Sequence, residues 1–362
     1  MRTKKPFLWL SLVLVVGLVV AACGGDDSDD AGTEDTAAEG GADGADCPDV
    51  EGDVIVSGSS TVEPISVAVG EALEDCGSGV AATVDGPGTG DGFQLFCAGE
   101  TDVSDASRPI DEEEVAACAD AGIEFIELKV GIDGISVLTN PDNEIECLSF
   151  ADLYALIGPE SEGFESWSDA QDLATELGSS TTFPDAPLDI TGPGAESGTY
   201  DSFLEIVFGD ISEARAEEGA ITEDQVETSR KDYTSQSDDN AIIAGIEGSE
   251  SGLGWVGFAF AEEAGDGVTE IPVSAEPDGQ CVEPTPETIA STEYPISRNL
   301  YIYVNAALAE ENPALEGFVD FYLSDAGIGA VEDVGYVPLT SEDLEATRAA
   351  WESRETGTRD GG

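Results

Sequence analysis

Histidine is absent from this 362-residue chain, and lysine and arginine together number only 12. Without histidine, and with no cysteine pair at C-x-x-C spacing, the usual ligands of a protein zinc site are missing, so we expect no metal and no cofactor. The same absence removes the commonest general base, and no other base stands beside a candidate nucleophilic serine. These absences argue against an enzyme such as a secreted phosphatase, and the scarcity of basic residues argues against a nucleic-acid partner.

Acidic residues, by contrast, are abundant. Asp and Glu number 78, which gives a formal net charge of -66 at pH 7. Self-repulsion on this scale opposes a compact state at low salt, whereas in molar salt the Debye length falls to about 3 Å and the penalty fades. The composition therefore favours a halophilic acidic surface, and the alternative is simply an acidic set of secreted proteins.

Residues 1–22 are typical of an export signal of the lipoprotein type. Arg2, Lys4 and Lys5 supply a positive start, and residues 7–20 form an apolar run too short for a comfortable membrane span. The V-A-A-C sequence ending at Cys23 resembles a bacterial lipobox, which implies that Cys23 is lipidated; an ordinary cleaved signal or a short anchor helix is the alternative. We expect an extracytoplasmic protein, lipid-anchored to the cell membrane at the cell surface or in the periplasm.

The next segment cannot form a core. Residues 24–46 contain no large apolar and no basic residue, so residues 23–46 are predicted to be an acidic disordered tether. The folded part should begin near Cys47 and end near Trp351, and residues 353–362 should form a flexible tail. Roughly 300 residues are too many for one ordinary core, so two lobes are expected.

After Cys23, an even number of cysteines remains, which in an exported chain favours three disulfides. The sequence leaves many pairings open, of which we favour Cys47–Cys76, Cys97–Cys118 and Cys147–Cys281. The first two close local loops, worth about 3 kcal/mol each in the chain-entropy model. The third ties together the two ends of the middle lobe.

Short β-rich runs alternate with helical stretches along the chain. Strands are expected at residues 54–57, 80–84, 123–129, 134–139, 188–191, 268–273 and 300–304, and helices at residues 64–75, 150–157, 200–208, 240–247, 313–324 and 342–352. Asn312 before Pro313 and the Ser149/Asp152 pair have the spacing of helix caps. This alternation indicates an α/β fold.

Two stretches look like crossings between the lobes. One is residues 130–134, and the other lies near residues 284–294, which are rich in Pro and Thr. We therefore expect lobe 1 to comprise residues 47–133 and 287–352, and lobe 2 to comprise residues 134–286. Two crossings of this kind give a cleft with a hinge.

Three turns rich in glycine and hydroxyl groups each precede a predicted helix. They are V-I-V-S-G-S-S-T-V-E-P-I-S at residues 54–66, D-G-P-G-T-G-D-G-F at residues 85–93 and T-G-P-G-A-E-S-G-T-Y-D-S at residues 191–202, the last leading into a helix that Gly209 should stop. Small residues there leave backbone N–H groups uncovered, and the positive end of the helix dipole attracts an anion. One such turn is usually only a turn, but three together suggest one oxyanion held by converging helix ends.

Longer motifs occur in order over about residues 50–345. They are S-G-S-S-T-V at residues 57–62, F-C-A-G-E-T-D-V-S-D-A-S-R-P-I at 96–110, G-P-G-x-x-S-G-T at 192–199, S-R at 297–298, V-D-F-Y-L at 319–323 and V-G-Y-V-P-L at 334–339. Through them the chain resembles the extracytoplasmic phosphate-binding proteins of ABC transporters (PstS-type), which are periplasmic binding proteins of type II.

The resemblance implies an α/β, two-lobed periplasmic-binding-protein fold (type II) with two hinge crossings. It also implies a monomeric solute-binding lipoprotein that captures inorganic phosphate and delivers it to ABC permease subunits in the membrane. A binder of another tetrahedral oxyanion, such as sulfate, is the alternative from the same class.

Carried over position by position, the resemblance implies a set of phosphate ligands. They are Ser60, Thr61 and Val62 in the first turn, Thr89 in the second, Ser107 and Arg108 after the next strand, and Ser197, Gly198 and Thr199 from the second lobe. These residues would supply hydroxyl groups, backbone N–H groups and one guanidinium.

The chain departs from the family pattern at two positions. Pro193 stands where some branches place an Arg, so Arg108 is the expected replacement, with Arg298 behind it. Ser107 stands where some branches place an Asp that accepts the proton of monohydrogen phosphate and repels sulfate. Asp105 and Glu196 are the nearest substitutes for that carboxylate.

Overall fold

The computed structural model describes residues 47–195 and 197–359, all within one compact unit, Gly44–Gly362. The predicted export signal, the lipidation of Cys23, the acidic tether and Glu196 lie outside these residues. Within them, no helix combines the length and the apolar character that a membrane crossing requires.

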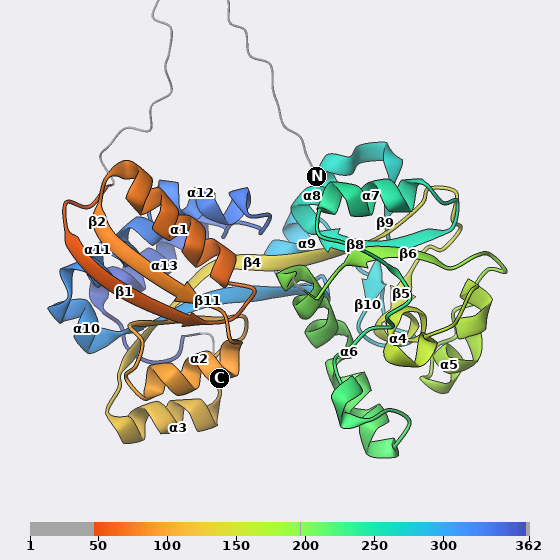
Figure 1. The fold of residues 1–362 in the computed structure, drawn as a ribbon, viewed down its shortest axis with the longest axis horizontal. Coiled ribbons are helices and arrows are strands. Elements are labelled where there is room, and N and C mark those ends of the chain that lie inside the picture. The colour runs from red at the N-terminus through yellow and green to blue at the C-terminus, as the bar shows by residue number, and fades with distance from the viewer. Residues whose placement is uncertain (1–46, 196, 360–362) are drawn as a thin grey trace, which may run out of the picture. The chain divides into compact units, whose positions relative to one another are not determined.

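A mixed sheet organises the described part of the chain (Figure 1). Nine strands pair in the order β2-β1-β3-β11-β4-β8-β6-β7, with β9 paired to β4. They are β1 (Glu51–Gly58), β2 (Gly79–Asp85), β3 (Val103–Ala106), β4 (Phe125–Thr139), β6 (Asp189–Pro193), β7 (Thr234–Gln236), β8 (Gly252–Gly257), β9 (Thr269–Glu270) and β11 (Ser297–Asn305). β5 (Leu148–Ser149) and β10 (Val273–Ser274) form a separate parallel pair.

Helices cover both groups of strands. In the first group, α1 and α11 lie on one side of β1 and β2, and α2 and α3 lie on the other (Figure 1). This group contains α1 (Glu63–Cys76), α2 (Thr89–Cys97), α3 (Glu112–Ala121), α10 (Ala306–Glu311), α11 (Pro313–Tyr322), α12 (Asp325–Asp333) and α13 (Ser341–Ser353). The second group contains α4 (Phe150–Ile157), α5 (Gln171–Glu176), α6 (Gly198–Glu218), α7 (Asp239–Glu247), α8 (Phe258–Ala264) and α9 (Pro286–Ala290).

The predicted caps form at two of these helices. The Asn312 side chain accepts the N–H of Ala314 at the start of α11, with Pro313 in the first turn. Ser149 and Asp152 form the capping box of α4. Local sequence therefore sets where these helices begin.

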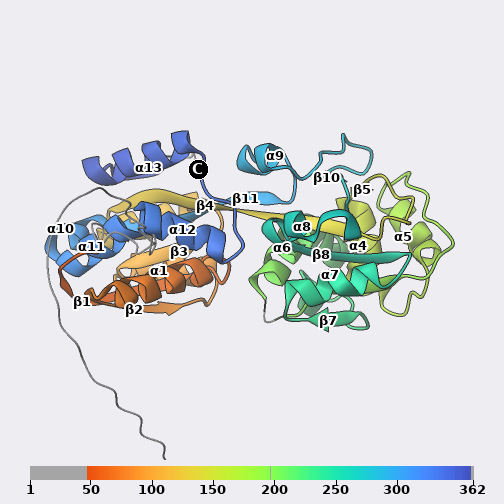
Figure 2. The ribbon, with the colours of Figure 1, turned by 90° about the horizontal axis from the view of Figure 1, so that it is seen from above.

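The strand β4 differs from expectation. The prediction of two strands separated at residues 130–134 was wrong, because β4 is continuous over 15 residues. Its first part pairs with β11 and its second part, from Ile135, pairs with β8. Its glycines serve close packing: a side chain at Gly131 would begin 2.9 Å from Val331, and one at Gly134 would begin 2.7 Å from Ile289. The crossing between the lobes is therefore a strand rather than a loop (Figure 2).

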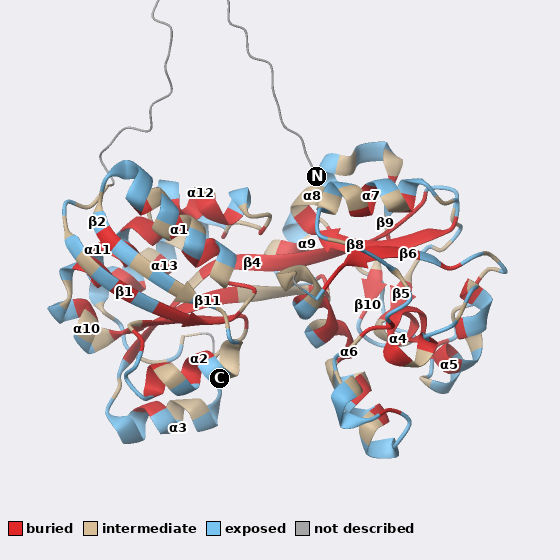
Figure 3. Ribbon diagram, viewed as in Figure 1, coloured by how far each residue is buried: buried red, intermediate tan, exposed pale blue. Residues whose placement is uncertain are grey.

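Two large buried clusters lie along this crossing strand. Every β4 residue except Lys129 is buried, and Figure 3 shows the burial extending along its length. Ile126, Leu128 and Val130 join a first cluster with β1, α1 and α11, whereas Ile135 and Val137 join a second cluster with α4, α6 and β8. The α/β, two-lobed fold expected from the sequence is confirmed.

The second core also includes part of the expected return crossing. Ile289, Tyr294 and Ile296 are fully buried in the second cluster. The chain then enters β11, whose later residues, such as Ile302 and Val304, belong to the first cluster. The exact division of the chain into lobes stays a prediction.

The helix α6 is longer than predicted. Gly209 does not stop it, and it runs to Glu218, where Gly219 adopts the left-handed conformation with φ 75°. A helical glycine costs about 1 kcal/mol, which later contacts offset. Chief among them, the nearly buried Arg215 donates to Glu160 and Glu176 at 2.7 Å each.

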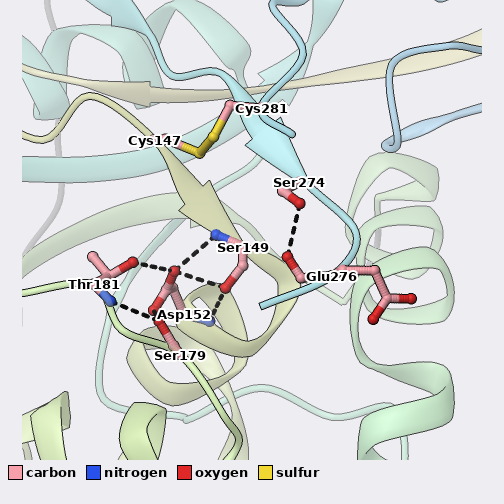
Figure 4. The surroundings of a disulfide bond; sticks show 8 residues. All are labelled: Cys147, Ser149, Asp152, Ser179, Thr181, Ser274, Glu276 and Cys281. Carbon is pink, nitrogen blue, oxygen red and sulfur yellow. Dashed lines mark hydrogen bonds between the residues drawn. A yellow bond between two sulfur atoms is a disulfide. The ribbon is translucent and has the colours of Figure 1, made fainter. Parts of the chain in front are cut away.

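Three disulfides are present, and their pairing is the one favoured from the sequence. Cys47–Cys76 joins the first described residue to the end of α1, and Cys97–Cys118 joins α2 to α3. Cys147–Cys281 spans 134 residues and lies beside β5 and β10 (Figure 4). Below it, the buried Asp152 accepts hydrogen bonds from the hydroxyls of Ser149, Ser179 and Thr181, which holds the start of α4 in place.

Residues 353–359, expected to be part of a flexible tail, make specific contacts. Arg354 lies 3.6 Å from the Trp351 ring centroid and donates to Glu316 at 2.7 Å. Gly357 forms a bridge to Ile126 in β4. The Arg359 N–H donates to Glu127 at 2.8 Å, so this segment packs on the first lobe.

Candidate ligand-binding site

The turns predicted in the first lobe meet at one edge of the sheet. β2 and β3 both pair with β1 in parallel, so their carboxyl ends lie together. The Gly88 N–H donates to the Gly58 carbonyl at 2.8 Å, which joins the first turn to the second. Thr89 Oγ1 lies 3.1 Å from Ser107 Oγ and accepts the Ser107 N–H at 3.3 Å. The second turn and the loop after β3 are therefore in direct contact.

The turn before α6 reaches the first turn from the second lobe. A side chain at Gly198 would begin 3.4 Å from the Ser60 carbonyl oxygen, so only a glycine allows this approach without pressure. Thr61 Oγ1 lies 3.0 Å from Ser202 Oγ, and the Ser60 hydroxyl donates to Asp201 at 3.3 Å. The structure thus brings together segments that lie about 140 residues apart in the chain.

Arg298 lies at the junction of these two segments. Its Nη2 donates to Ser202 Oγ at 2.9 Å and to Thr61 Oγ1 at 3.2 Å. Its Nη1 donates to Glu205 at 2.6 Å, and its side chain is only 14% exposed. Because Arg298 in β11 pairs with Asp133 in β4, the two crossing strands hold this guanidinium between the lobes.

Asp133 is a site residue that sequence reasoning missed. Its side chain is 3% exposed, and its Oδ2 lies 3.6 Å from Arg298 Nε. Within the described residues, neither of these two atoms has a hydrogen-bond partner. Burial raises the pKa of Asp133, and the charge of Arg298 and a hydrogen bond from Ser202 oppose that rise. The only signal in the sequence was one acid in an apolar strand, V-G-I-D-G-I.

Arg108 does not take the place expected for it. Its Nη1 and Nη2 donate to the two oxygens of Glu114 at 2.8 Å each, and the side chain is 37% exposed. The hydrogen bond to Glu114 is also the main cause of its raised pKa. Arg108 does line the same open hollow as Ser107 and Arg298. It is nevertheless Arg298 that contacts Thr61, so the order expected from the sequence is reversed in the structure.

Backbone groups in the two main turns differ in availability. The Val62 N–H, expected to face a ligand, donates to the Ser59 carbonyl at 3.1 Å and so closes the turn. Ser197 is the N-cap of α6 and makes no side-chain capping bond, while Gly198 and Thr199 form the first helical turn. The first N–H groups of a helix lack intrahelical acceptors, so this end of α6 can bind an anion.

Asp105 faces away from the groove. Its Oδ1 accepts the Ser66 hydroxyl of α1 at 2.9 Å, and the residue is fully buried. The same Ser66 hydroxyl lies 3.3 Å from the Tyr322 hydroxyl of α11. This placement contradicts the expectation that Asp105 substitutes for the missing proton acceptor, because its carboxyl is directed behind α1.

Asp105 should instead make folding stability depend on pH. Burial raises its pKa to about 7; the Ser66 hydrogen bond opposes this, and the charge of Glu63 adds to it. Since an unfolded Asp titrates near pH ~4, its contribution to stability is present below about pH 4 and is lost as the pH rises through 7. We expect Asp105→Asn to lose less stability than wild type between pH 5 and pH 8, measured by denaturant unfolding at fixed salt. The exposed Asp120→Asn serves as control, and equal pH dependence in Asp105→Asn and wild type would refute this role.

The fold and this junction define a class of protein. A two-lobed α/β protein with hydroxyl groups and a guanidinium gathered where its crossing strands meet is a type II periplasmic binding protein. The model of the PBP superfamily domain matches residues 32–326. The chain therefore belongs to the PBP superfamily.

Individual relatives place it more closely. It is 35% identical over 313 residues to protein SphX of Synechocystis sp., covering 85% of both chains. It is 32% identical over 338 residues to the phosphate-binding protein PstS of Staphylococcus epidermidis, covering 92% of this chain and 89% of that one. A crystal structure of "a possible phosphate binding protein" from Planctomyces limnophilus is 35% identical, covers 84% of this chain and 99% of that chain, and superimposes with a TM-score of 0.74. The chain is thus a homologue of the SphX and PstS proteins.

Proposed function

We propose that this protein captures inorganic phosphate between its lobes and delivers it to the membrane subunits of an ABC permease. The observation that carries the proposal is the junction of Thr61, Ser202 and Arg298, which gathers two hydroxyl groups and one guanidinium from three separate segments. The printed names of two relatives, phosphate-binding proteins, point to the same ligand. We further infer that the protein acts as a monomer, anchored through a lipid on Cys23.

The residues expected from the resemblance remain the proposed ligands, with a changed emphasis. Ser60, Thr61, Thr89 and Ser107 supply hydroxyl groups from the first lobe. The N-terminal turn of α6 supplies Ser197, Gly198 and Thr199. Arg298 is the principal cation, and Arg108 contributes only if the oxyanion displaces Glu114 from it.

A chain with a net charge of -66 can bind an anion because the local field decides. We infer that the acidic surface is an adaptation to high salt, in which distant carboxylates are screened within a few ångströms. Each charge-assisted hydrogen bond to phosphate contributes about 1.5–3 kcal/mol. Several of them offset desolvation and suffice for micromolar or tighter binding.

The choice of phosphate over sulfate rests on Asp133. Monohydrogen phosphate carries a proton that it can donate to a carboxylate, whereas sulfate at neutral pH has none. The buried Asp133 has an unpartnered oxygen beside Arg298 and is therefore the best-placed proton acceptor among the described residues. A bound sulfate would place two anions together with no hydrogen between them.

Calorimetry of the ligand-stripped mature protein tests this function. In high NaCl, we expect saturable binding of one phosphate per chain and no measurable heat from sulfate at the same concentration. Competition titrations with molybdate and sulfate then rank the oxyanions. Tighter binding of sulfate than phosphate, or no binding of any tetrahedral oxyanion, would overturn the proposal.

A further inference from the structure

Glu205 occupies the guanidinium on which the proposed function depends. It lies on α6, and its Oε2 accepts Arg298 Nη1 at 2.6 Å, while Nη2 contacts Thr61 and Ser202. A carboxylate and a phosphate use the same planar donors of an arginine. The two anions therefore need the same face of Arg298.

The two partners of this pair are not equally buried. The Arg298 side chain is 14% exposed and is held by the crossing strands, whereas the Glu205 side chain is 44% exposed. Glu205 can consequently turn toward water at little cost in solvation, while Arg298 cannot follow it. A partly exposed ion pair is worth only about 1 kcal/mol or less, so a better anion can replace the carboxylate.

The charge of Glu205 also reaches other acids around the junction. It lines the open hollow together with Ser107 and Arg108. It is among the causes that raise the pKa of Asp133, Asp201 and Glu227. An incoming dianion meets the same repulsion that these carboxyl groups feel.

We propose that Glu205 is a resident carboxylate that occupies Arg298 in the unliganded protein and competes with the oxyanion, so that it limits affinity. This inference rests on the proposed function and adds a residue that tunes it. The opposite role is also physically defined: if Glu205 orients Arg298 for the ligand, then removing its charge weakens binding. The two roles predict opposite signs for one substitution.

Glu205→Gln is the decisive variant, because it removes the charge and keeps the shape. We expect it to bind phosphate about tenfold more tightly than wild type, measured by calorimetry at moderate salt. The gain should shrink in molar NaCl, since part of it is Coulombic. Glu217→Gln, on an exposed part of the same helix, makes the same change in net charge and should bind like wild type.

The outcomes separate cleanly. Equal or weaker phosphate binding by Glu205→Gln, with wild-type circular dichroism and melting temperature, overturns the competitor role. A tenfold gain in Glu217→Gln as well would show a general charge effect and would also overturn it. If Glu205→Gln folds poorly, Glu205→Asp shortens the reach to Arg298 and should give a smaller gain, whereas a loss refutes the inference. Failure of the wild type to bind any phosphate would sink the proposed function itself.

Discussion

Arg298→Ala is expected to weaken phosphate binding by about a hundredfold or more. The substitution removes the guanidinium that contacts both lobes, and a charge-assisted hydrogen bond is worth about 1.5–3 kcal/mol. Loss of about 3 kcal/mol already corresponds to roughly two decades in the dissociation constant. Calorimetry of ligand-stripped protein in high NaCl measures the change directly.

Arg108→Ala is the matched control for this prediction. It deletes the same side chain from the same hollow, but from a guanidinium that is already bound to both oxygens of Glu114. We therefore expect a loss of less than about tenfold. If Arg108→Ala proved the more damaging of the two, the order inferred from the sequence would be right and the contacts of Arg298 would be structural.

Folding of the Arg298 variant must be examined separately, because Arg298 also neutralises the buried Asp133. Removing one partner of a buried pair can cost about 3–5 kcal/mol. Arg298→Lys keeps the charge and loses the planar fork, so it should be folded and should recover only part of the affinity. Full affinity in Arg298→Lys would mean that only charge at this position matters.

Much of the fold could be predicted from local sequence. The alternation of apolar periods gave the α/β class, and the limits of α4 agree with the predicted 150–157. Cysteine spacing gave the three disulfides, because the short loops are local and one pair remains. β4 was missed because its glycines resemble a turn, and only tertiary packing against Val331 and Ile289 reveals why they are there.

The site was predicted less completely than the fold. The turns at Thr61, Thr89 and Gly198 carry their chemistry in local sequence, so their positions at helix starts could be anticipated. Which arginine contacts Thr61 depends on tertiary placement. The capping glutamate Glu114 of α3 takes Arg108, although the S-R-P-I-D-E-E-E run could have suggested that competition.

Asp133→Asn is expected to relax the choice between phosphate and sulfate. The carboxylate should accept a proton from phosphate and repel sulfate, whereas an amide carries no charge and can donate a hydrogen bond to either anion. We expect sulfate affinity to rise by at least about tenfold and phosphate affinity to fall. Competitive calorimetry at neutral pH, with the exposed Asp120→Asn as control, measures both changes.

The pH dependence gives this prediction a second, independent sign. Burial raises the pKa of Asp133 above the ordinary range of an aspartate. As the pH falls through that pKa, the wild-type carboxyl gains a proton and can donate it to sulfate, so sulfate binding should strengthen in acid. The amide of Asp133→Asn does not titrate, and its sulfate affinity should stay flat over the same range. If wild type and variant responded to pH alike, the proton acceptor would have to be some other group, and the unpartnered oxygen beside Arg298 would be only a feature of the hinge.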